Sequence, residues 1–406
     1  MSEWQETEII SKVAATWKEY KLDEIGDFKN GANFNAQAFG FGYPVVNVKH
    51  LYKGRYAELD NLDEVKTETI KKIDDYELRN NDLLFARSSV TLEGTGQVTM
   101  VNNLPNRKFI FSGFIIRFRC TSSNVNSSFL SYLLRTKYYK EHFVNIAAGT
   151  SIINLSQDTL KKISVYLPDV EEQKSIASVL SSLDDKIDLL HRQNTTLERM
   201  AETLFRQWFV EEAQEDWEEK PLSSIANFLN GLACQKFPPT DAINKLPVLK
   251  IKELTSGISE KSDWATSKVK PEYIVENGDV IFAWSASLMV KVWNGEKCVL
   301  NQHLFKVTSQ VFPKWFYLYW CKYHLDEFIS ISSSHATTMG HIKRGDLDTA
   351  MVKVPKPQEL ALMTEQMTPL LEKQIINAKQ IKTLEKLRDN LLPKLMSGEV
   401  RVDSIR

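Results

Sequence analysis

Few residues in this 406-residue chain have the types and spacing that a reaction would need. The strongest candidate is "PDVEEQK" (168–174), where Pro168-Asp169 precede Glu172 and Lys174 in the order of a metal-dependent nuclease signature. That chemistry needs two carboxylates that converge on Mg²⁺ from separate elements of a sheet. Here the groups share one turn at the expected start of a helix. We therefore interpret Asp169 as a helix cap with Glu172 as its first-turn partner.

The other catalytic and metal-binding patterns that we sought are missing. A phosphate-binding P-loop needs a Gly-Lys pair, and the chain has none. The Pro-Pro of "KFPPTD" (236–241) lacks the preceding Asn or Asp of an amino-methyltransferase loop and indicates a rigid turn. No metal-ligand spacing links the histidines or cysteines, namely His303, His324, His335, His341, Cys120, Cys234, Cys298 and Cys321. We expect surface or core histidines, no metal and no cofactor in this chain.

Composition indicates a reduced, cytoplasmic protein. Lys+Arg number 51 and Asp+Glu 52, and 43% of residues are hydrophobic. No apolar run of about 18 residues predicts a transmembrane helix, and the acidic start is unlike a signal peptide. Residues 17–167 and 217–354 are mildly basic, whereas 168–216 are acidic. This distribution would allow nucleic-acid contact through local patches only.

The sequence segments that would form the elements positioning any functional residues occur twice in the chain. "WKEYKLDEIGDFKNG" (17–31) recurs half a chain later as "WEEKPLSSIANFLNG" (217–231). The match continues at a drifting offset, which pairs Pro44 with Pro247, Asp82 with Asp279, Lys108 with Lys297, and the segment 149–168 with 336–355. The length changes fall between the matched apolar runs. A conserved framework with variable loops indicates a duplicated domain whose loops carry specificity.

Each copy has the pattern of a mixed α/β (α+β) unit. The runs 44–51, 82–87 and 114–120 predict strands, and 127–143 and 313–329 have helical spacing. The resulting boundaries are an N-terminal extension (1–16), a first domain (17–167), a first helix (168–212), a second domain (213–354) and a second helix with tail (355–406).

A 3.5-residue apolar repeat follows each domain and predicts a coiled-coil seam. We prefer two long antiparallel helices that pack on each other and space two heads; the alternative is that each helix packs on its own domain. The first helix, 171–209, would be about 58 Å long. Gln374, Asn377 and Arg388 weaken the second seam, and Pro393 is expected to end or kink that helix. The seam residues are Ile176, Leu180, Leu183, Ile187, Leu190, Leu197 and Leu204 in the first helix and Met363, Met367, Leu370, Ile381, Leu384, Leu391 and Leu395 in the second.

Three segments resemble the specificity subunits of type I restriction-modification systems. They are the paired openings "KLDEIGDFKNG" and "PLSSIANFLNG", the central helix that begins "LPDVEEQK" and ends "RQWFVE", and the closing "TLEKLRDNLLPKLMSGEVRV". The resemblance covers residues 17–402. The second helix departs from the pattern, because "VPKPQELALMTEQ" replaces the usual proline followed by Glu-Glu-Gln.

The resemblance implies a non-catalytic subunit with two target-recognition domains, each binding one half of a split, asymmetric sequence in double-stranded DNA. The helix pair would set the half-site spacing and dock two modification subunits, which would carry S-adenosylmethionine and methylate adenine. Two restriction subunits using ATP and Mg would join them. The competing interpretation is a scaffold whose heads bind proteins, which the near-neutral charge favours; a standalone nuclease comes third.

We expect DNA contacts in polar loops, foremost the matched pair that directly follows a strand in each copy, because bases are read by polar side chains and phosphates are held by cations and hydroxyls. Lys49 and Lys250, on matching strand ends, are expected to contact phosphate. Arg87 faces Trp284 in the alignment, as expected if the heads read different sequences. The alternatives are a core Trp284, a solvated Arg87, and helix caps or turns in the other loops. The candidates are Lys49, Arg87, Ser88, Ser89, Thr91, Thr150, Ser151, Asn154, Lys250, Trp284, Ser285, Ser287, Thr337, Thr338, His341, Lys343 and Arg344.

Overall fold

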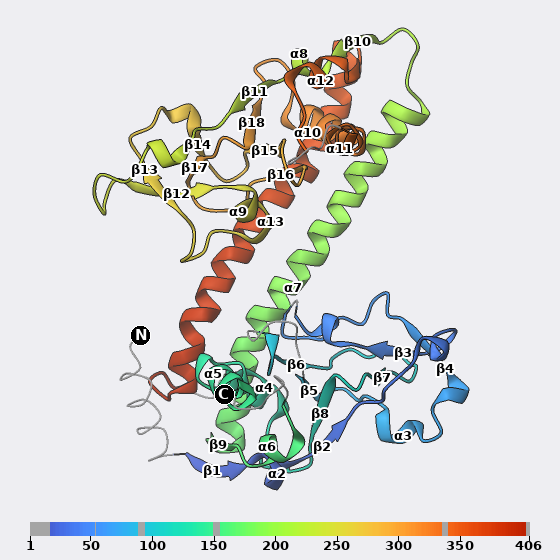
Figure 1. Cartoon of the computed structure of the whole chain (residues 1–406), viewed down its shortest axis with the longest axis vertical. Coiled ribbons are helices and arrows are strands. Elements are labelled where there is room, and N and C mark those ends of the chain that lie inside the picture. The colour runs from blue at the N-terminus through green and yellow to red at the C-terminus, as the bar shows by residue number, and fades with distance from the viewer. Residues whose placement is uncertain (1–16, 53, 88–93, 149–154, 335–339, 403–406) are drawn as a thin grey trace. The chain divides into compact units, whose positions relative to one another are not determined.

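The computed structural model describes residues 17–402 apart from 53, 88–93, 149–154 and 335–339. The chain forms two compact units, residues 1–186 with 384–406 and residues 187–383. Each unit holds one copy of the repeat, which we call head 1 (17–167) and head 2 (217–354). Each also holds one part of each long helix, α7 (Val170–Arg206) and α13 (Pro357–Met396) (Figure 1).

The described strands of head 1 form three small sheets. Its central sheet is antiparallel with the order β2-β8-β5-β6, a second sheet has the order β4-β3-β7, and β1 pairs with β9. The strands are β1 (Lys18–Lys21), β2 (Gly26–Asn30), β3 (Gly42–Val46), β4 (Glu64–Lys66), β5 (Leu83–Ala86), β6 (Val98–Met100), β7 (Ile110–Phe111), β8 (Ile115–Cys120) and β9 (Ser164–Leu167).

Head 2 repeats this topology with one additional strand, β14, in its second sheet. Its sheets have the orders β11-β18-β15-β16, β13-β12-β17-β14 and β10-β19. The strands are β10 (Glu218–Pro221), β11 (Asn227–Asn230), β12 (Lys245–Leu249), β13 (Trp264–Thr266), β14 (Ile274–Val275), β15 (Val280–Ala283), β16 (Met289–Val292), β17 (Cys298–Leu300), β18 (Leu304–Thr308) and β19 (Met351–Val354).

The helices of the heads are short. Head 1 has α2 (Leu22–Ile25), α3 (Ile73–Tyr76), α4 (Ser127–Leu134), α5 (Lys137–Ala148) and α6 (Gln157–Lys161). Head 2 has α8 (Leu222–Ile225), α9 (Ile251–Ser256), α10 (Lys314–Tyr323), α11 (Leu325–Ser334) and α12 (Arg344–Thr349). The expectation of a duplicated, mixed α/β fold is confirmed. No helix of the described residues, including α7 and α13, could cross a membrane.

The repeat aligned by sequence is also a repeat of backbone hydrogen bonds. The amide of Leu22 donates to the carbonyl of Ile163 at 3.0 Å, and Leu222 donates to Ala350 at 2.8 Å. Both donors follow the first strand of a head, and both acceptors hold the same place in the matched segments 149–168 and 336–355. The two copies therefore share their framework down to single bonds.

Four local expectations differ from the structure. The strand 44–51 ends at Val46, because the side chain of Asn47 caps the 3₁₀ turn Val48–Leu51 and accepts from the Val48 amide at 2.8 Å. The helix 127–143 divides at Arg135, whose guanidinium donates to the carbonyls of Gly54 and Val98, both at 2.8 Å.

The helix 313–329 likewise divides into α10 and α11 at His324, whose ring bonds Glu327 and the carbonyl of Met351, each at 3.0 Å. Pro393 does not end α13, which continues to Met396. Its missing amide falls in the last turn, where Leu395 and Met396 are buried in the head 1 core and keep the chain helical.

Helix α7 begins as expected. The Oδ1 atom of Asp169 accepts from the amides of Glu171 and Glu172 at 3.0 and 2.9 Å, so the nuclease-like order of residues is a helix cap. At its other end α7 passes into a π-turn, Gln207–Glu211, where Phe209 is buried against Trp217 and Trp320 of the head 2 core.

The long helices run antiparallel within each unit. In unit 1, Ile176 and Leu180 of α7 share a core with Leu395 of α13, and in unit 2, Ala201 shares a core with Met367. All fourteen predicted seam residues are buried or half-buried. Both helices also contribute to the core of the adjacent head. The long helices therefore pack on each other and also on a head.

Two polar residues of the second helix, Arg388 and Asn377, form hydrogen bonds across the seam. In unit 1 the Arg388 guanidinium lies 2.9 Å from Asp184, which also accepts from the Tyr132 hydroxyl at 2.6 Å. In unit 2 the fully buried Asn377 donates to Asn194 at 2.9 Å. A buried amide pair favours one register of two helices at some cost in stability.

The Asn-Gly pair that closes each opening motif has a packing role. A Cβ atom on Gly31 would lie well under 3.0 Å from the carbonyl oxygen of Ser112, and one on Gly231 would lie as close to that of Asn301. These distances are far below contact distance and involve backbone atoms, which cannot move aside alone. Only glycine fits at these two matching positions.

We expect Gly231→Ala to lower the free energy of unfolding by about 1–3 kcal/mol through overpacking. Gly345→Ala is the matched control in the same unit, because its Cβ would meet nothing within 4 Å and it lies in α12, where alanine is favoured. Urea unfolding of both variants measures the difference. Equal stability of the two would contradict the close approach.

Candidate nucleic-acid interface

The loops after β5 and β15 leave their sheets at the same point. In head 1 the amide of Arg87 donates to the carbonyl of Phe114 at 2.9 Å, and in head 2 the amide of Trp284 donates to that of His303 at 3.4 Å. Arg87 and Trp284 therefore hold equivalent backbone positions. Two heads with one framework present different side chains at the same edge.

Trp284 is half-buried and joins the core to the surface of head 2. Its ring stacks on Phe305 at 5.6 Å between centroids, and its Nε1 donates to Asn230 Oδ1 at 3.2 Å. The rings of His303 and His341 lie 6.2 and 6.3 Å away. The cluster places two imidazoles and an amide around the indole, so Trp284 is neither a simple core residue nor a free surface one.

The serines that follow Trp284 have different surroundings. Ser285 is buried, and its hydroxyl shares a hydrogen bond of 3.0 Å with Nδ1 of His303. The Nε2 atom of that ring lies 3.3 Å from the side-chain nitrogen, Nε2, of Gln302. Ser285 therefore orients His303, whereas Ser287 is exposed to solvent.

Head 1 presents a cation and an aromatic ring at this edge. Arg87 is half-buried, with Nη1 3.4 Å from the carbonyl oxygen of Gly113. Phe114 is next to it in the sheet and is 57% exposed. Asn33 covers Gly113 so closely that a Cβ there would lie well under 3.0 Å from its Oδ1. Arginine beside an exposed ring offers both directed donors and a stacking face.

The third group of candidates lies at the start of α12. The backbone amide of Lys343 donates to the side chain of Asp346 at 2.6 Å, so the backbone here caps helix α12, as the helix-cap alternative expected. His341, Lys343 and Arg344 are themselves exposed. The remaining loop candidates lie outside the described residues: Ser88, Ser89, Thr91, Thr150, Ser151, Asn154, Thr337 and Thr338.

Lys49 and Lys250 follow matching strands, β3 and β12, but the expectation that they hold matching positions is wrong. Lys250 directly precedes helix α9, the place that Asn47 holds before its 3₁₀ turn. The register that matches β3 with β12 therefore pairs Lys250 with Asn47. Both lysines nevertheless reach equivalent aspartates. Lys49 lies 3.2 Å from Asp63, and Lys250 pairs with Asp263.

Sequence reasoning missed the residues that directly precede the neighbouring strands β8 and β18, chiefly Phe114, Gln302 and His303. The register that matches Lys108 with Lys297 also matches Phe114 with His303. Looking for chemical differences along every matched run, and not only after β5 and β15, would have found this pair. Asn230 was missed because it ends the shared opening motif.

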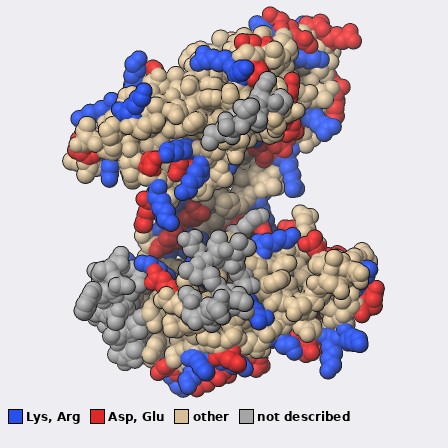
Figure 2. Space-filling model, viewed as in Figure 1, with Lys and Arg blue, Asp and Glu red and all other residues tan. Residues whose placement is uncertain are grey.

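The arrangement offers hydrogen bonding and stacking and no reactive group. No cluster of three or more His, Cys, Asp or Glu side chains among the described residues could hold a metal ion. Burial raises the pKa of the Cys120 thiol to about 11 and also raises the pKa of the Cys298 thiol, which disfavours the reactive thiolates. Figure 2 shows acidic and basic side chains interspersed on the visible face of each unit.

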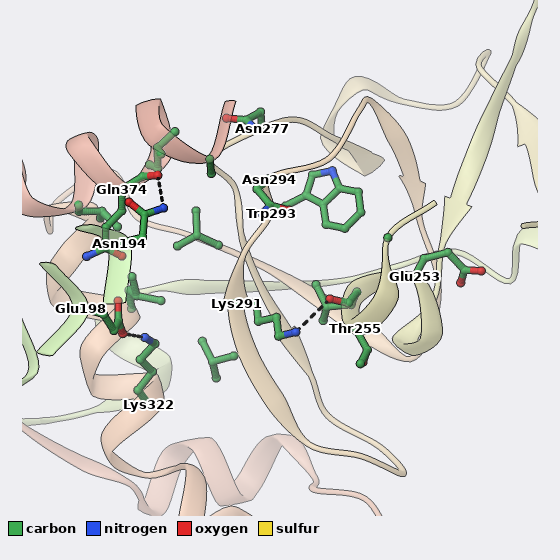
Figure 3. A pocket seen from close by; sticks show the side chains of 18 residues that line it. Asn194, Glu198, Glu253, Thr255, Asn277, Lys291, Trp293, Asn294, Lys322 and Gln374 are labelled. Carbon is green, nitrogen blue, oxygen red and sulfur yellow. Dashed lines mark hydrogen bonds and ion pairs between the residues drawn. The ribbon is translucent and has the colours of Figure 1, made fainter. Parts of the chain in front are cut away.

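A pocket of about 310 Å³ in unit 2 lies between β16 and the long helices (Figure 3). Several of its polar residues are paired with one another or with backbone carbonyls. Lys322 forms an ion pair with Glu198, Asn194 donates to the carbonyl of Gln374 at 3.2 Å, and Lys291 donates to that of Leu254 at 3.3 Å. The first contact joins head 2 to α7, the second joins α7 to α13, and the third lies within head 2. No acid–base pair among these described residues is left poised for catalysis.

Comparison with known proteins gives one consistent result. The family described as "Type I restriction modification DNA specificity domain" matches residues 15–199 and 214–386. The MjaIX specificity subunit of a type I restriction enzyme from Methanocaldococcus jannaschii is 27% identical, over 100% of this chain and 98% of its own length. The putative MjaX specificity subunit from the same organism is 22% identical over 97% and 96%. The crystal structure of the S subunit of a type I system from M. genitalium has the same fold, with a TM-score of 0.58, 16% identity and coverage of 94% and 96%.

Proposed function

The chain belongs to the type I restriction-modification DNA specificity family, and we propose that its two heads each bind one half of a bipartite, asymmetric DNA site. The observation that carries the proposal is the matched edge after β5 and β15. One framework there presents Arg87 and Phe114 in head 1 and Trp284 and His303 in head 2. Different donors on matching scaffolds would read different bases.

The side chains suit base recognition. Arginine pairs in bidentate fashion with guanine, and amide and hydroxyl groups pair with adenine or either base. Arg87 supplies the first kind of group, and Gln302, Ser287 and His341 supply donors around Trp284. The loop residues around 88–91, 150–154 and 337–338 complete the proposed contacts.

Lys49, Lys250, Lys343 and Arg344 are proposed to hold phosphates. The ion pairs of Lys49 and Lys250 are exposed at the surface, with lysine side-chain exposures of 63% and 44%. Exposed pairs contribute little to stability, so each ammonium can exchange a carboxylate for a phosphate at small cost.

The helix pair is proposed to set the half-site spacing and to dock two modification subunits. A groove of about 490 Å³ on the helices in unit 2 supports docking, because most of the surface that its residues expose in the groove belongs to apolar atoms. It is formed by Leu189, Arg192, Gln193, Thr196, Leu197 and Lys373, and Leu189 stays 40% exposed. An apolar groove between two helices fits the apolar face of a partner helix.

The catalytic steps are assigned to those partners. We propose that the modification subunits bind S-adenosylmethionine and methylate adenine, and that restriction subunits, where they are present, use ATP with Mg. The described residues supply no metal-binding cluster for these reactions. The complex would act on DNA in the cytoplasm.

Methylome sequencing of cells that carry the chain, lack it, or carry Arg87→Ala or Trp284→Ala tests the DNA proposal. We expect a split motif that disappears without the chain. Each variant should lose about 1–3 kcal/mol of discrimination between the correct and the wrong base in one half-site, and base preference in the other half-site should be unchanged. Methylation that does not depend on the chain would support the protein-binding scaffold instead.

Leu189→Asp should weaken binding of the modification subunit by at least tenfold, because a charge would enter the apolar groove. Thr195→Asp is the control, an exposed position of α7 outside that groove. Titration of each purified variant with the modification subunit gives the two dissociation constants. Equal constants would remove this groove as the docking site.

A further inference from the structure

In the described part of each head, one large apolar side chain lies almost fully in solvent, in the turn that leads into the third strand. Phe41 before β3 is 95% exposed and Ile243 before β12 is 90% exposed. Among the described residues the next most exposed large apolar side chain is Val311, at 81%. Single exposed apolar residues are common in proteins. Two in the same turn of a duplicated fold, one position apart in the register that matches β3 with β12, indicate a shared role.

The turn of head 1 is held in shape by Glu64. Its carboxylate accepts from the amide of Gly42 at 2.8 Å and from Arg107 at 2.6 Å, and its carbonyl accepts from the amide of Gly40 at 3.0 Å. The hydrogen bond from Arg107 holds the pKa of the Glu64 carboxyl below its ordinary value. Phe41 is therefore presented outward by a tied turn.

Head 2 reaches the same result with other residues. The Asp241 carboxylate accepts from the amide of Ile243 and from the side chain of Asn244, both at 2.9 Å. Hydrogen bonds from Asn244 hold the pKa of the Asp241 carboxyl below its ordinary value. Rigid presentation lowers the entropy cost of binding, and here two unrelated sets of contacts achieve it.

A lysine lies beside each apolar tip, on the same rung of the strand pair but on opposite strands. In head 1 the rung pairs Gly42 with Lys66, and in head 2 it pairs Lys245 with Thr266. Lys66 donates to the carbonyl of Gln37 at 3.1 Å, and Lys245 lies 4.4 Å from the ring centroid of Trp264.

Neither of these two ammonium groups forms an ion pair with a carboxylate in the described part of the chain. Their positive charge is therefore available to an anionic partner. The position of the charge is kept although the residue that carries it has changed strand.

We propose that these two turns are apolar wedges that enter a groove of the bound DNA, each with its lysine on the adjacent phosphates. DNA presents apolar base steps and anionic phosphates side by side, which matches an apolar tip next to a cation that no carboxylate neutralises. In each unit the turn lies at the end of the head remote from α7 and α13 (Figure 1). The inference rests on the proposed function and adds a contact outside the base-reading edge.

The test uses the chain assembled with its modification subunit and a duplex that carries its methylated sequence. Phe41→Ala should weaken binding about tenfold, within the range for loss of one base–aromatic contact, with an unchanged salt dependence. Lys66→Ala should instead lower the slope of log affinity against log salt concentration by about 0.9. Val311→Ala, an exposed apolar control in head 2, should bind as the unaltered chain does.

Ile243→Ala should weaken binding in the same sense as Phe41→Ala. If both variants bind the duplex like the unaltered chain, the wedge is overturned, and loss of the modification subunit in those variants would assign the turns to a protein contact. If the unaltered complex itself shows no preference for its sequence, the proposed function fails instead.

Discussion

The backbone ladder that joins the first strand of each head to its last strand is the constraint on which the other features depend. β1 pairs with β9 from Lys18–Leu167 to Lys21–Ser164, and β10 pairs with β19 in the corresponding register. Each ladder brings the two ends of a head to the base of a long helix. The sheets between those ends can then vary in loop length and chemistry while the framework bonds are kept.

The framework was predictable because packing repeats itself in sequence. Matched apolar runs, the shared Trp and Asn-Gly, and the 3.5-residue seam all follow from burial, which tolerates few residue types at each position. The breaks at Arg135 and His324 were not predictable. They depend on hydrogen bonds to backbone carbonyls that are distant in the sequence, and local helical spacing continues across them.

The candidate interface was only partly accessible for the same reason. Arg87 and Trp284 could be paired because each follows a recognisable strand. The positioning of His303 by Ser285, or of the indole by Asn230, depends on neighbouring strands that meet only after folding. The shift of Lys250 to the place of Asn47 shows a further limit, since similar residues near a strand end need not be structural equivalents.

The two heads are anchored to their helix segments by different chemistry. Tyr132 in α4 donates to Asp184 beside Arg388, whereas Tyr319 in α10 donates to Glu198 beside Lys322. Buried charged pairs contribute little net stability but are costly to break singly. Each anchor thus favours its own arrangement, and the heads are alike in fold without being interchangeable at their bases.

The strand pairs β1–β9 and β10–β19 affect how the chain tolerates insertions and deletions within a head. The offset between matched residues shrinks along the copies, from the pair Pro44 and Pro247 to the pair Leu167 and Val354, so head 2 is shorter than head 1. Because both ends of a head meet in one ladder, that difference is not transmitted to the helices that follow. Each head therefore begins and ends in one strand pair, and residues can be gained or lost between those two strands without moving the start of the helix that follows.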